Sequence, residues 1–218
     1  MPHRPIFITG IGTGVGKTLA AAIITEALQA DYWKPIQAGL EGNTDTVIVK
    51  QLLSNTDSVV HPELYRLYTS ASPHIAARID EILIDGNIIA QKAESIIETI
   101  GSKQLIIEGA GGLLVPLTDN FMVADLIKLL NARVILVSRN YLGSINHSLL
   151  TAAYCREKNI DVIGWLFNDD YLNYENEIVN WSGYPSLGSI PKMGTIDQIT
   201  VHQQAMHIQQ SLMDKLKT

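Results

Sequence analysis

The chain has 218 residues, of which 46% are hydrophobic and 17% are charged, and this composition is typical of a globular protein. Its 16 basic and 22 acidic residues give a formal net charge of −6, so no chain-wide positive field exists to hold nucleic acid or an anionic membrane surface. Local groups must therefore bind any anionic ligand, and no apolar run reaches the ~18 residues that a membrane-spanning helix needs.

The predicted elements alternate between short apolar strands and helices. The first strand covers residues 5–9, and a glycine-rich turn leads from it into a helix whose apolar residues recur at helical spacing. A second short strand is predicted to end at Trp33, and later strands are predicted over 105–107, 134–137, 162–167 and 187–190. The helices are predicted over 17–29, 44–54, 88–100, 124–130, 144–158 and 196–216. The segment 56–75, which includes two prolines, is predicted to be mostly loop.

Strands made of continuous apolar residues, alternating with helices, indicate an α/β fold with a mainly parallel sheet and helices on both faces. No repeat, linker or low-complexity stretch interrupts the chain, so one domain over residues 1–218 is predicted. The lone cysteine, Cys155, cannot form an internal disulfide and is predicted to be a core residue of a cytoplasmic protein. The first strand begins within about five residues of Met1, which leaves no room for a signal peptide.

The turn after the first strand predicts a phosphate-binding loop and hence a P-loop NTPase fold. Its glycines allow successive backbone N–H groups to face an anion, and the helix that follows adds its positive N-terminal end. Lys17 is expected to neutralise phosphate charge and Thr18 to bind Mg²⁺. The loop is one residue longer than the common pattern, because five residues separate Gly10 from Gly16. The ATP-binding residues predicted here are Gly12, Thr13, Gly14, Val15, Gly16, Lys17, Thr18 and Leu19.

Three further segments extend this pattern, namely residues 33–39 (WKPIQAG), 108–112 (EGAGG) and 142–147 (LGSINH). Together with the loop, and in this order, they closely resemble the dethiobiotin synthetases over residues 7–191. The resemblance implies a homodimeric ligase of biotin biosynthesis that uses 7,8-diaminononanoate, CO₂ or bicarbonate, ATP and Mg²⁺. In the implied reaction, one amine captures CO₂ as a carbamate, ATP phosphorylates the carbamate, and the second amine closes a cyclic urea while ADP and phosphate leave.

The resemblance also implies roles for individual residues. Lys34, Lys17 and Thr13 are the catalytic residues, with Lys34 placed to neutralise both the carbamate and the γ-phosphate. Thr18, Asp45 and Glu108 are the metal ligands, since hydroxyl and carboxylate oxygens suit Mg²⁺. The simpler readings are a solvated surface lysine for Lys34, a helix-dipole partner or cap at the start of a helix for Asp45, a backbone-satisfied buried glutamate for Glu108 and a solvent-facing threonine for Thr13.

The remaining implied contacts divide between nucleotide and diamine. Further ATP contacts are implied for Asp45, Glu108, Gly109, Ala110, Gly111, Asn168, Asp169 and Pro191, with the Asn168 amide on adenine. The diamine substrate is implied to contact Lys34, Ala38, Gly111, Gly112, Leu142, Gly143, Ser144 and Asn146, the last four from the partner subunit of a dimer. His74 and His147 also lie in family segments, but neither is assigned a catalytic role.

The chain departs from the family pattern at three positions and leaves two alternatives open. Gly12 and Gly14 stand where the family carries acidic residues, and Ala38 stands where Ser or Thr is frequent. One alternative is a cobyrinate amidase-type synthetase, although such enzymes carry an added glutaminase domain. The other is a nucleotide-switch ATPase of the partitioning type, although those proteins carry a second lysine early in the loop and residues 10–13 contain none.

Overall fold

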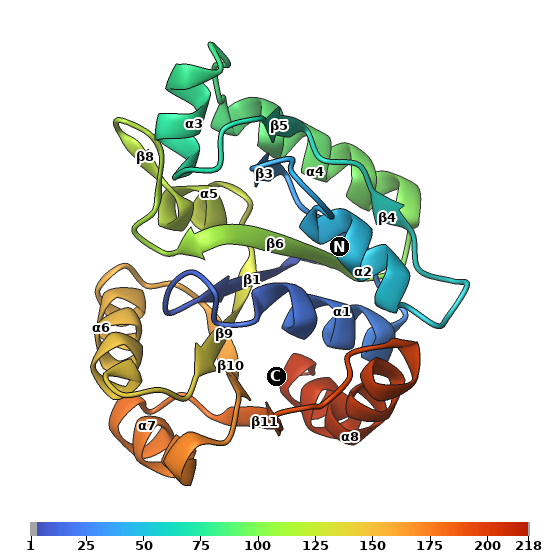
Figure 1. Ribbon diagram of the computed structural model, residues 1–218, viewed down its shortest axis with the longest axis vertical. Coiled ribbons are helices and arrows are strands. Elements are labelled where there is room, and N and C mark those ends of the chain that lie inside the picture. The colour runs from blue at the N-terminus through green and yellow to red at the C-terminus, as the bar shows by residue number, and fades with distance from the viewer. Residues whose placement is uncertain (1–3, 218) are drawn as a thin grey trace.

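Seven parallel strands form one sheet at the centre of the computed structural model, which describes residues 4–217 (Figure 1). β1 lies in the middle, with Ile6 opposite Ile106 on one side and opposite Arg133 on the other. The predicted mainly parallel sheet is therefore confirmed. In spatial order the strands are β11 (Ser186–Ile190), β10 (Val162–Asn168), β9 (Arg133–Arg139), β1 (Ile6–Gly10), β6 (Leu105–Gly112), β2 (Asp31–Trp33) and β4 (Val60–His61).

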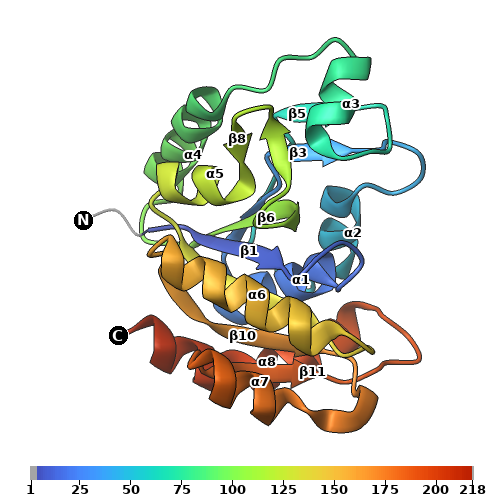
Figure 2. The same cartoon turned by 90° about the vertical axis from the view of Figure 1, so that its left-hand side faces the viewer.

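Helices cover both faces of this sheet, as the two views together show (Figures 1 and 2). One face carries α1 (Lys17–Leu28), α2 (Asp45–Leu52) and α8 (Gln198–Leu216), and the other carries α4 (Gly86–Ile100), α5 (Val123–Leu129), α6 (Ser144–Glu157) and α7 (Glu175–Ser182).

Side chains of the central strands alternate between the two faces. Phe7 packs into the core on the α4–α7 side, whereas Ile6 and Ile8 pack into the core on the α1 side. Complete burial of each such side chain stabilises the fold by about 2 kcal/mol. Cys155 lies in the first core as predicted, and burial raises the pKa of its thiol to about 12.

Most residues of the segment 56–75 lie outside helices and strands, so the prediction of mostly loop is confirmed, although three short elements within it were not predicted. This segment contains β4, β5 (Tyr65–Leu67) and the start of α3 (Pro73–Ile79), and β5 pairs with β3 (Ile36–Ala38) in a small parallel sheet. Strands of two or three residues are too short to show a period, and they form here because partners distant in sequence pair with them. Pro73 suits the first turn of a helix, where no N–H is needed.

Other elements were also missed or mis-sized in the sequence prediction. β6 does not end at residue 107 but continues through Glu108 to Gly112, so this carboxylate projects from within a strand. The antiparallel pair β7 (Pro116–Thr118) and β8 (Phe121–Met122), the 3₁₀ turn Tyr171–Asn173 and α7 were not predicted.

Two further predictions concern membrane-spanning helices and the N-terminus. Within residues 4–217, no helix is both long and apolar enough to cross a membrane. The prediction about a signal peptide concerns residues 1–4, and of these the first three lie outside the described part of the chain.

Candidate active site at the carboxyl edge of the sheet

The glycine-rich loop joins the carboxyl end of β1 to the amino end of α1. Gly14 and Gly16 have φ values of +73° and +92°, which L side chains rarely adopt. A Cβ on Gly16 would also lie 2.1 Å from Nδ2 of Asn168. Gly16 is the N-cap of α1, and no side chain caps this helix and no acidic residue occupies its first turn. The first N–H groups of α1 are therefore available to an anion.

Lys17 follows this loop and folds back over it. Its Nζ donates a hydrogen bond to the carbonyl oxygen of Gly12 at 2.8 Å, and the residue is largely buried. Burial lowers the pKa of Lys17 to about 8, with the charge of Lys34 contributing and Glu108 and Asp45 opposing. An arriving phosphate would supply the negative charge that this ammonium lacks.

Four side chains from separate elements meet beside the loop. Oγ1 of Thr18 lies 2.9 Å from Oδ1 of Asp45 and 3.0 Å from Oε1 of Glu108. Nζ of Lys34 lies 2.8 Å from Oδ2 of Asp45 and 3.1 Å from Oε1 of Glu108. The residues predicted as metal ligands and the predicted catalytic lysine are thus brought together from α1, α2, β6 and the end of β2.

The simpler readings of Lys34 and Glu108 are wrong, and that of Asp45 is wrong as to the cap but holds as to the helix dipole, because Asp45 lies in the first turn of α2. Lys34 is only 4% exposed, so it is not a solvated surface lysine. Thr44 caps α2 by accepting from the N–H of Val47, which leaves Asp45 in the first turn with its carboxylate free for Thr18 and Lys34. Glu108 is held by side chains and not by backbone groups.

Electrostatics keep this cluster charged. Burial disfavours the ammonium of Lys34, but the Glu108 and Asp45 carboxylates outweigh that effect and raise its pKa. Burial likewise works against ionised Asp45, and Lys34 outweighs it and lowers the pKa of Asp45. With Lys17 the cluster holds two positive and two negative groups close together.

Two supporting residues were missed in the sequence prediction. The Tyr32 hydroxyl donates to Oε2 of Glu108 at 2.7 Å, and burial together with the Glu108 charge raises the pKa of Tyr32 well above its usual value. Oε1 of Gln37 accepts from the N–H of Asp45 at 3.3 Å, at the start of α2. The sequence contained one signal for Tyr32. Because strand side chains alternate, residues 32 and 34 point to the same face of the sheet, and Lys34 was already a predicted site residue.

These groups open into a cleft of about 760 Å³. Most of the predicted loop and strand residues line it, and further residues of β3, of α3 and of the loop before α3, for which no ligand contact was predicted, complete its walls. The predicted residues that line it are Thr13, Gly14, Gly16, Lys17, Thr18, Lys34, Ala38, Asp45, Glu108, Gly109, Ala110 and Gly111. The additional ones are Ile36, Gln37, Ser70, Ala71, Ser72, Pro73 and Val115.

The other predicted site residues lie outside this cleft. Gly12 and Gly112 line a separate cavity of about 370 Å³ between the loop and α6, and His147 lines the same cavity. Nδ2 of Asn168 donates to the carbonyl of Val15 at 3.0 Å and so packs on the back of the loop. Those not lining the cleft are Gly12, Val15, Leu19, Gly112, Leu142, Gly143, Ser144, Asn146, Asn168, Asp169 and Pro191.

Like Asn168, two more of these residues already have partners for their side chains within the chain. The hydroxyl of Ser144 is buried against the Tyr174 hydroxyl at 2.7 Å, so this side chain is already engaged. The Asp169 carboxylate pairs with Arg139 at 3.2 Å.

The oxygen set formed by Thr18, Asp45 and Glu108 fits a hard cation. A hydroxyl and two carboxylates converge, which are the donors that Mg²⁺ prefers. Residues 4–217 contain no group of three or more His, Cys, Asp or Glu side chains that could hold a metal. An ion at this position would therefore take its remaining ligands from nucleotide phosphates and water, which is the usual arrangement for Mg²⁺.

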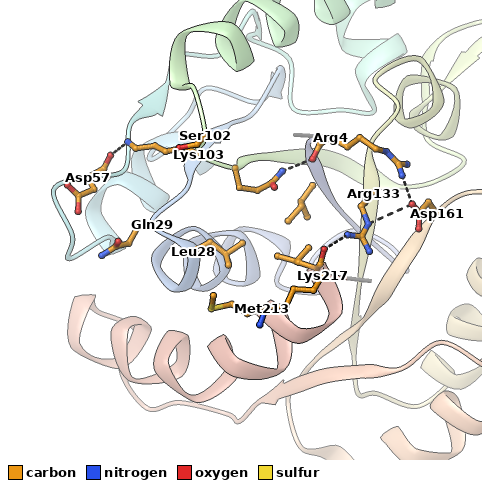
Figure 3. Close-up of a pocket in the computed structure, with 13 residues that line it drawn as sticks. Arg4, Leu28, Gln29, Asp57, Ser102, Lys103, Arg133, Asp161, Met213 and Lys217 are labelled. Atoms are coloured by element: carbon orange, nitrogen blue, oxygen red, sulfur yellow. Dashed lines mark hydrogen bonds and ion pairs between the residues drawn. The ribbon is translucent and has the colours of Figure 1, made fainter. Parts of the chain in front are cut away.

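A larger cavity of about 990 Å³ lies at the opposite, amino edge of the sheet (Figure 3). Arg4 and Arg133 both pair with Asp161 there, and Arg133 also donates to the last carbonyls of α8. Lys103 pairs with Asp31 and donates to the carbonyl of Asp57. These cations are paired within the protein, and neither the glycine-rich loop nor the residues predicted as metal ligands line this cavity, so it is not the candidate site.

Comparison with known proteins gives relatives over nearly the whole chain. A family model described as an AAA domain matches residues 4–200. The ATP-dependent dethiobiotin synthetase BioD of Cytophaga hutchinsonii is 52% identical over 186 residues, which cover 84% of this chain and 86% of the relative. That of Christiangramia forsetii is 46% identical over 204 residues, which cover 93% of this chain and 94% of the relative.

Solved structures with a similar fold are more distant in sequence. A ParA family ATPase from Chlorobium tepidum has a TM-score of 0.59 at 15% identity, covering 95% of this chain and 100% of that one. The cell division protein MinD of Aquifex aeolicus has a TM-score of 0.58 at 14% identity, covering 99% of this chain and 96% of that one. At these identities the likeness shows the shared P-loop fold alone.

Proposed function

The chain belongs to the family of ATP-dependent dethiobiotin synthetases, ligases that form carbon–nitrogen bonds, and from this premise we propose how its cleft performs the reaction. The substrates are 7,8-diaminononanoate, CO₂ and ATP, and the product is the cyclic urea dethiobiotin. The observation that carries the proposal is the buried ammonium of Lys34, which reaches the cleft between two carboxylates and the phosphate-binding loop.

The proposed sequence has three bond-forming steps. One amine attacks CO₂ to form a carbamate and releases a proton. An oxygen of the carbamate then attacks the γ-phosphorus of ATP, and ADP leaves with the electron pair of the broken bond. The second amine attacks the carbon of the resulting carbamic-phosphoric anhydride, phosphate leaves, and the loss of a second proton gives the urea ring.

The loop and Lys17 bind the triphosphate in this proposal. The N–H groups around Gly14 and Gly16 and those of the first turn of α1 donate to phosphate oxygens. Lys17 exchanges the carbonyl of Gly12 for a phosphate oxygen, which restores a full negative partner to its ammonium. Thr13 lies on the cleft wall and donates its hydroxyl to the carbamate or the γ-phosphate.

Lys34 brings the two anionic reactants together. Because its pKa is raised, it stays protonated at neutral pH and can stabilise the carbamate and the γ-phosphate at once. Holding both reactants on one charge converts an encounter of two anions into a reaction within a single complex. The carboxylates of Asp45 and Glu108 fix the position of the ammonium before the substrates arrive.

Thr18, Asp45 and Glu108 would hold Mg²⁺. The ion supplies positive charge that offsets the charge of the phosphates when it is bound. The Asn168 amide, released from Val15, is proposed to recognise adenine, with Asp169 and Pro191 beside it. The diamine carboxylate is proposed to bind free N–H groups around Asn146, at the start of α6 in a second protomer of a homodimer.

A product assay tests this proposal. Purified protein is given the diamine, bicarbonate and MgATP, and the cyclic urea is measured by mass spectrometry alongside phosphate release. The expected result is product in proportion to phosphate, with both lost when the diamine or bicarbonate is omitted. Steady phosphate release without the diamine would contradict the proposal and favour the nucleotide-switch ATPase.

A further inference from the structure

The carboxylate of Glu108 is divided between two environments. Its Oε1 faces the cleft, where Thr18 and Lys34 donate to it at 3.0 and 3.1 Å. Its Oε2 points back toward the core beneath the cleft, and within residues 4–217 the hydrogen-bond donor to it is the hydroxyl of Tyr32 at 2.7 Å. A carboxylate that is only 1% exposed cannot replace a lost donor with bulk water.

Strand register explains why Tyr32 reaches this oxygen. β2 pairs with β6 so that Tyr32 lies opposite Ile106 and Trp33 opposite Ile107. Tyr32 and Ile106 pack into the core on the α1 side, whereas Trp33 and Ile107 pack into the other core. Since strand side chains alternate, Glu108 projects to the same side of the sheet as Ile106 and Tyr32. It lies two residues beyond Ile106 along β6, nearer the cleft.

We propose that Tyr32 is a positioning residue, whose hydroxyl holds Oε2 of Glu108 in the core and thereby presents Oε1 to Thr18, Lys34 and the metal. This inference rests on the proposed function, because it takes Glu108 as a ligand of Mg²⁺. The aromatic ring is completely buried, so its hydroxyl has one fixed place, and a carboxylate held by a fixed donor keeps one orientation. Tyr32 is fully buried and does not line the cleft, so in this proposal it acts only through Glu108.

The proposal predicts that metal affinity falls when the hydroxyl of Tyr32 is removed. Tyr32→Phe keeps the ring and leaves Oε2 without its donor, so the carboxylate can turn and its affinity for metal falls. Loss of such an outer partner weakens metal binding by about tenfold or more. The Mg²⁺ concentration that gives half-maximal binding of a non-hydrolysable ATP analogue should therefore rise about tenfold, as measured by titration calorimetry. Binding of the same analogue in EDTA should stay within about twofold of wild type.

Two comparisons separate a positioning role from a structural one. Tyr65→Phe removes another tyrosine hydroxyl that is hydrogen-bonded, in this case by accepting from the N–H of Asp85, and should leave the Mg²⁺ dependence unchanged. In a Glu108→Gln background, Tyr32→Phe should add little further effect, because the residue through which it acts is already altered. An unchanged Mg²⁺ midpoint in Tyr32→Phe, equal weakening with Mg²⁺ and with EDTA, or additive effects in the double variant would each overturn the inference.

The wild-type protein provides an independent measurement that needs no folded Tyr32→Phe variant. With tyrosine labelled at the ring carbon that bears the hydroxyl, the Tyr32 signal should shift when ADP and Mg²⁺ are added and stay in place with ADP and EDTA. The signal is assigned as the one that moves in Glu108→Gln. No Mg²⁺-specific shift would overturn the inference, whereas a wild-type protein whose nucleotide binding ignores Mg²⁺ would instead refute the proposed metal site.

Discussion

The two edges of the central sheet each hold a buried carboxylate paired with a lysine, yet the glycine-rich loop lies at the carboxyl edge. At the carboxyl edge, Lys34 lies 3.1 Å from Glu108, and at the amino edge Lys103 lies 3.3 Å from Asp31. The amino-edge cavity is the larger of the two, at about 990 Å³ against about 760 Å³. Neither cavity size nor the presence of an ion pair therefore identifies the site.

The difference lies in how the remaining hydrogen-bonding capacity is used. At the amino edge, Asp31 also binds His61 at 2.9 Å and the N–H of Val59, and Lys103 also reaches a backbone carbonyl. At the carboxyl edge, Lys34 pairs with two carboxylates that face a cleft, beside a loop that leads into a helix with no side-chain cap at its first turn. A lysine–carboxylate pair thus stabilises the fold at the amino edge, whereas the corresponding pair at the carboxyl edge faces the cleft that we propose binds the substrates.

The largest expected difference between the two edges is the effect on turnover of replacing each lysine by alanine. Lys34→Ala removes the charge shared by carbamate and γ-phosphate, so turnover should fall about a thousandfold while ATP affinity changes much less. Lys103→Ala should leave turnover unchanged and lower the free energy of unfolding by about 1 kcal/mol. Steady-state kinetics and chemical denaturation measure both, and undiminished turnover in Lys34→Ala would remove this residue from the mechanism.

The two carboxylates offer a second contrast. Glu108→Gln removes a charged oxygen from the proposed metal site, so the Mg²⁺ concentration for half-maximal activity should rise about a hundredfold. Asp31→Asn should destabilise the protein by about 2 kcal/mol, because three donors lose a charged acceptor, with no change in the Mg²⁺ titration. A Mg²⁺ titration of Glu108→Gln that matches wild type would count against its role as a ligand.

Two glycines with positive φ values, one in the loop and one outside it, test the role of the loop. Gly16→Ala places a methyl group against Asn168 at a strained φ of +92°, so nucleotide affinity should fall about tenfold. Gly183→Ala has comparable strain, at φ +73°, but meets open space far from the loop, and should cost about 1 kcal/mol of stability alone. Calorimetric titration with ADP would decide, and equal affinities in the two variants would show that loop geometry is not required.

A third buried carboxylate, Glu26 on α1, should affect stability only. Burial raises its pKa, but hydrogen bonds from Ser54, His202 and Asn55 outweigh burial and lower it to about 2. A lowered folded-state pKa stabilises the protein above the ordinary value near 4.5, and this contribution is lost as the pH falls toward 2. Glu26→Gln should therefore cost about 2 kcal/mol at pH 7, and less at pH 3, without altering turnover. A stability difference from wild type that does not shrink with acid would contradict this assignment.

The sheet, the main helices and the loop could be predicted from the sequence because each produces a pattern among neighbouring residues. Apolar strands, helical spacing and the glycine pattern before Lys17 need no knowledge of distant partners. The short strands β3 and β5 and the role of Tyr32 depend on pairing between segments far apart, and Tyr32 meets Glu108 across 76 positions of sequence. Such contacts follow from register, which a local pattern does not contain.

A crystal structure with a non-hydrolysable ATP analogue and Mg²⁺ tests the central claim most directly. The account predicts the triphosphate along residues 10–18, its terminal phosphate next to Nζ of Lys34, and the metal on Thr18, Asp45 and Glu108. A triphosphate bound elsewhere, for example among the arginines of the amino-edge cavity, would contradict it.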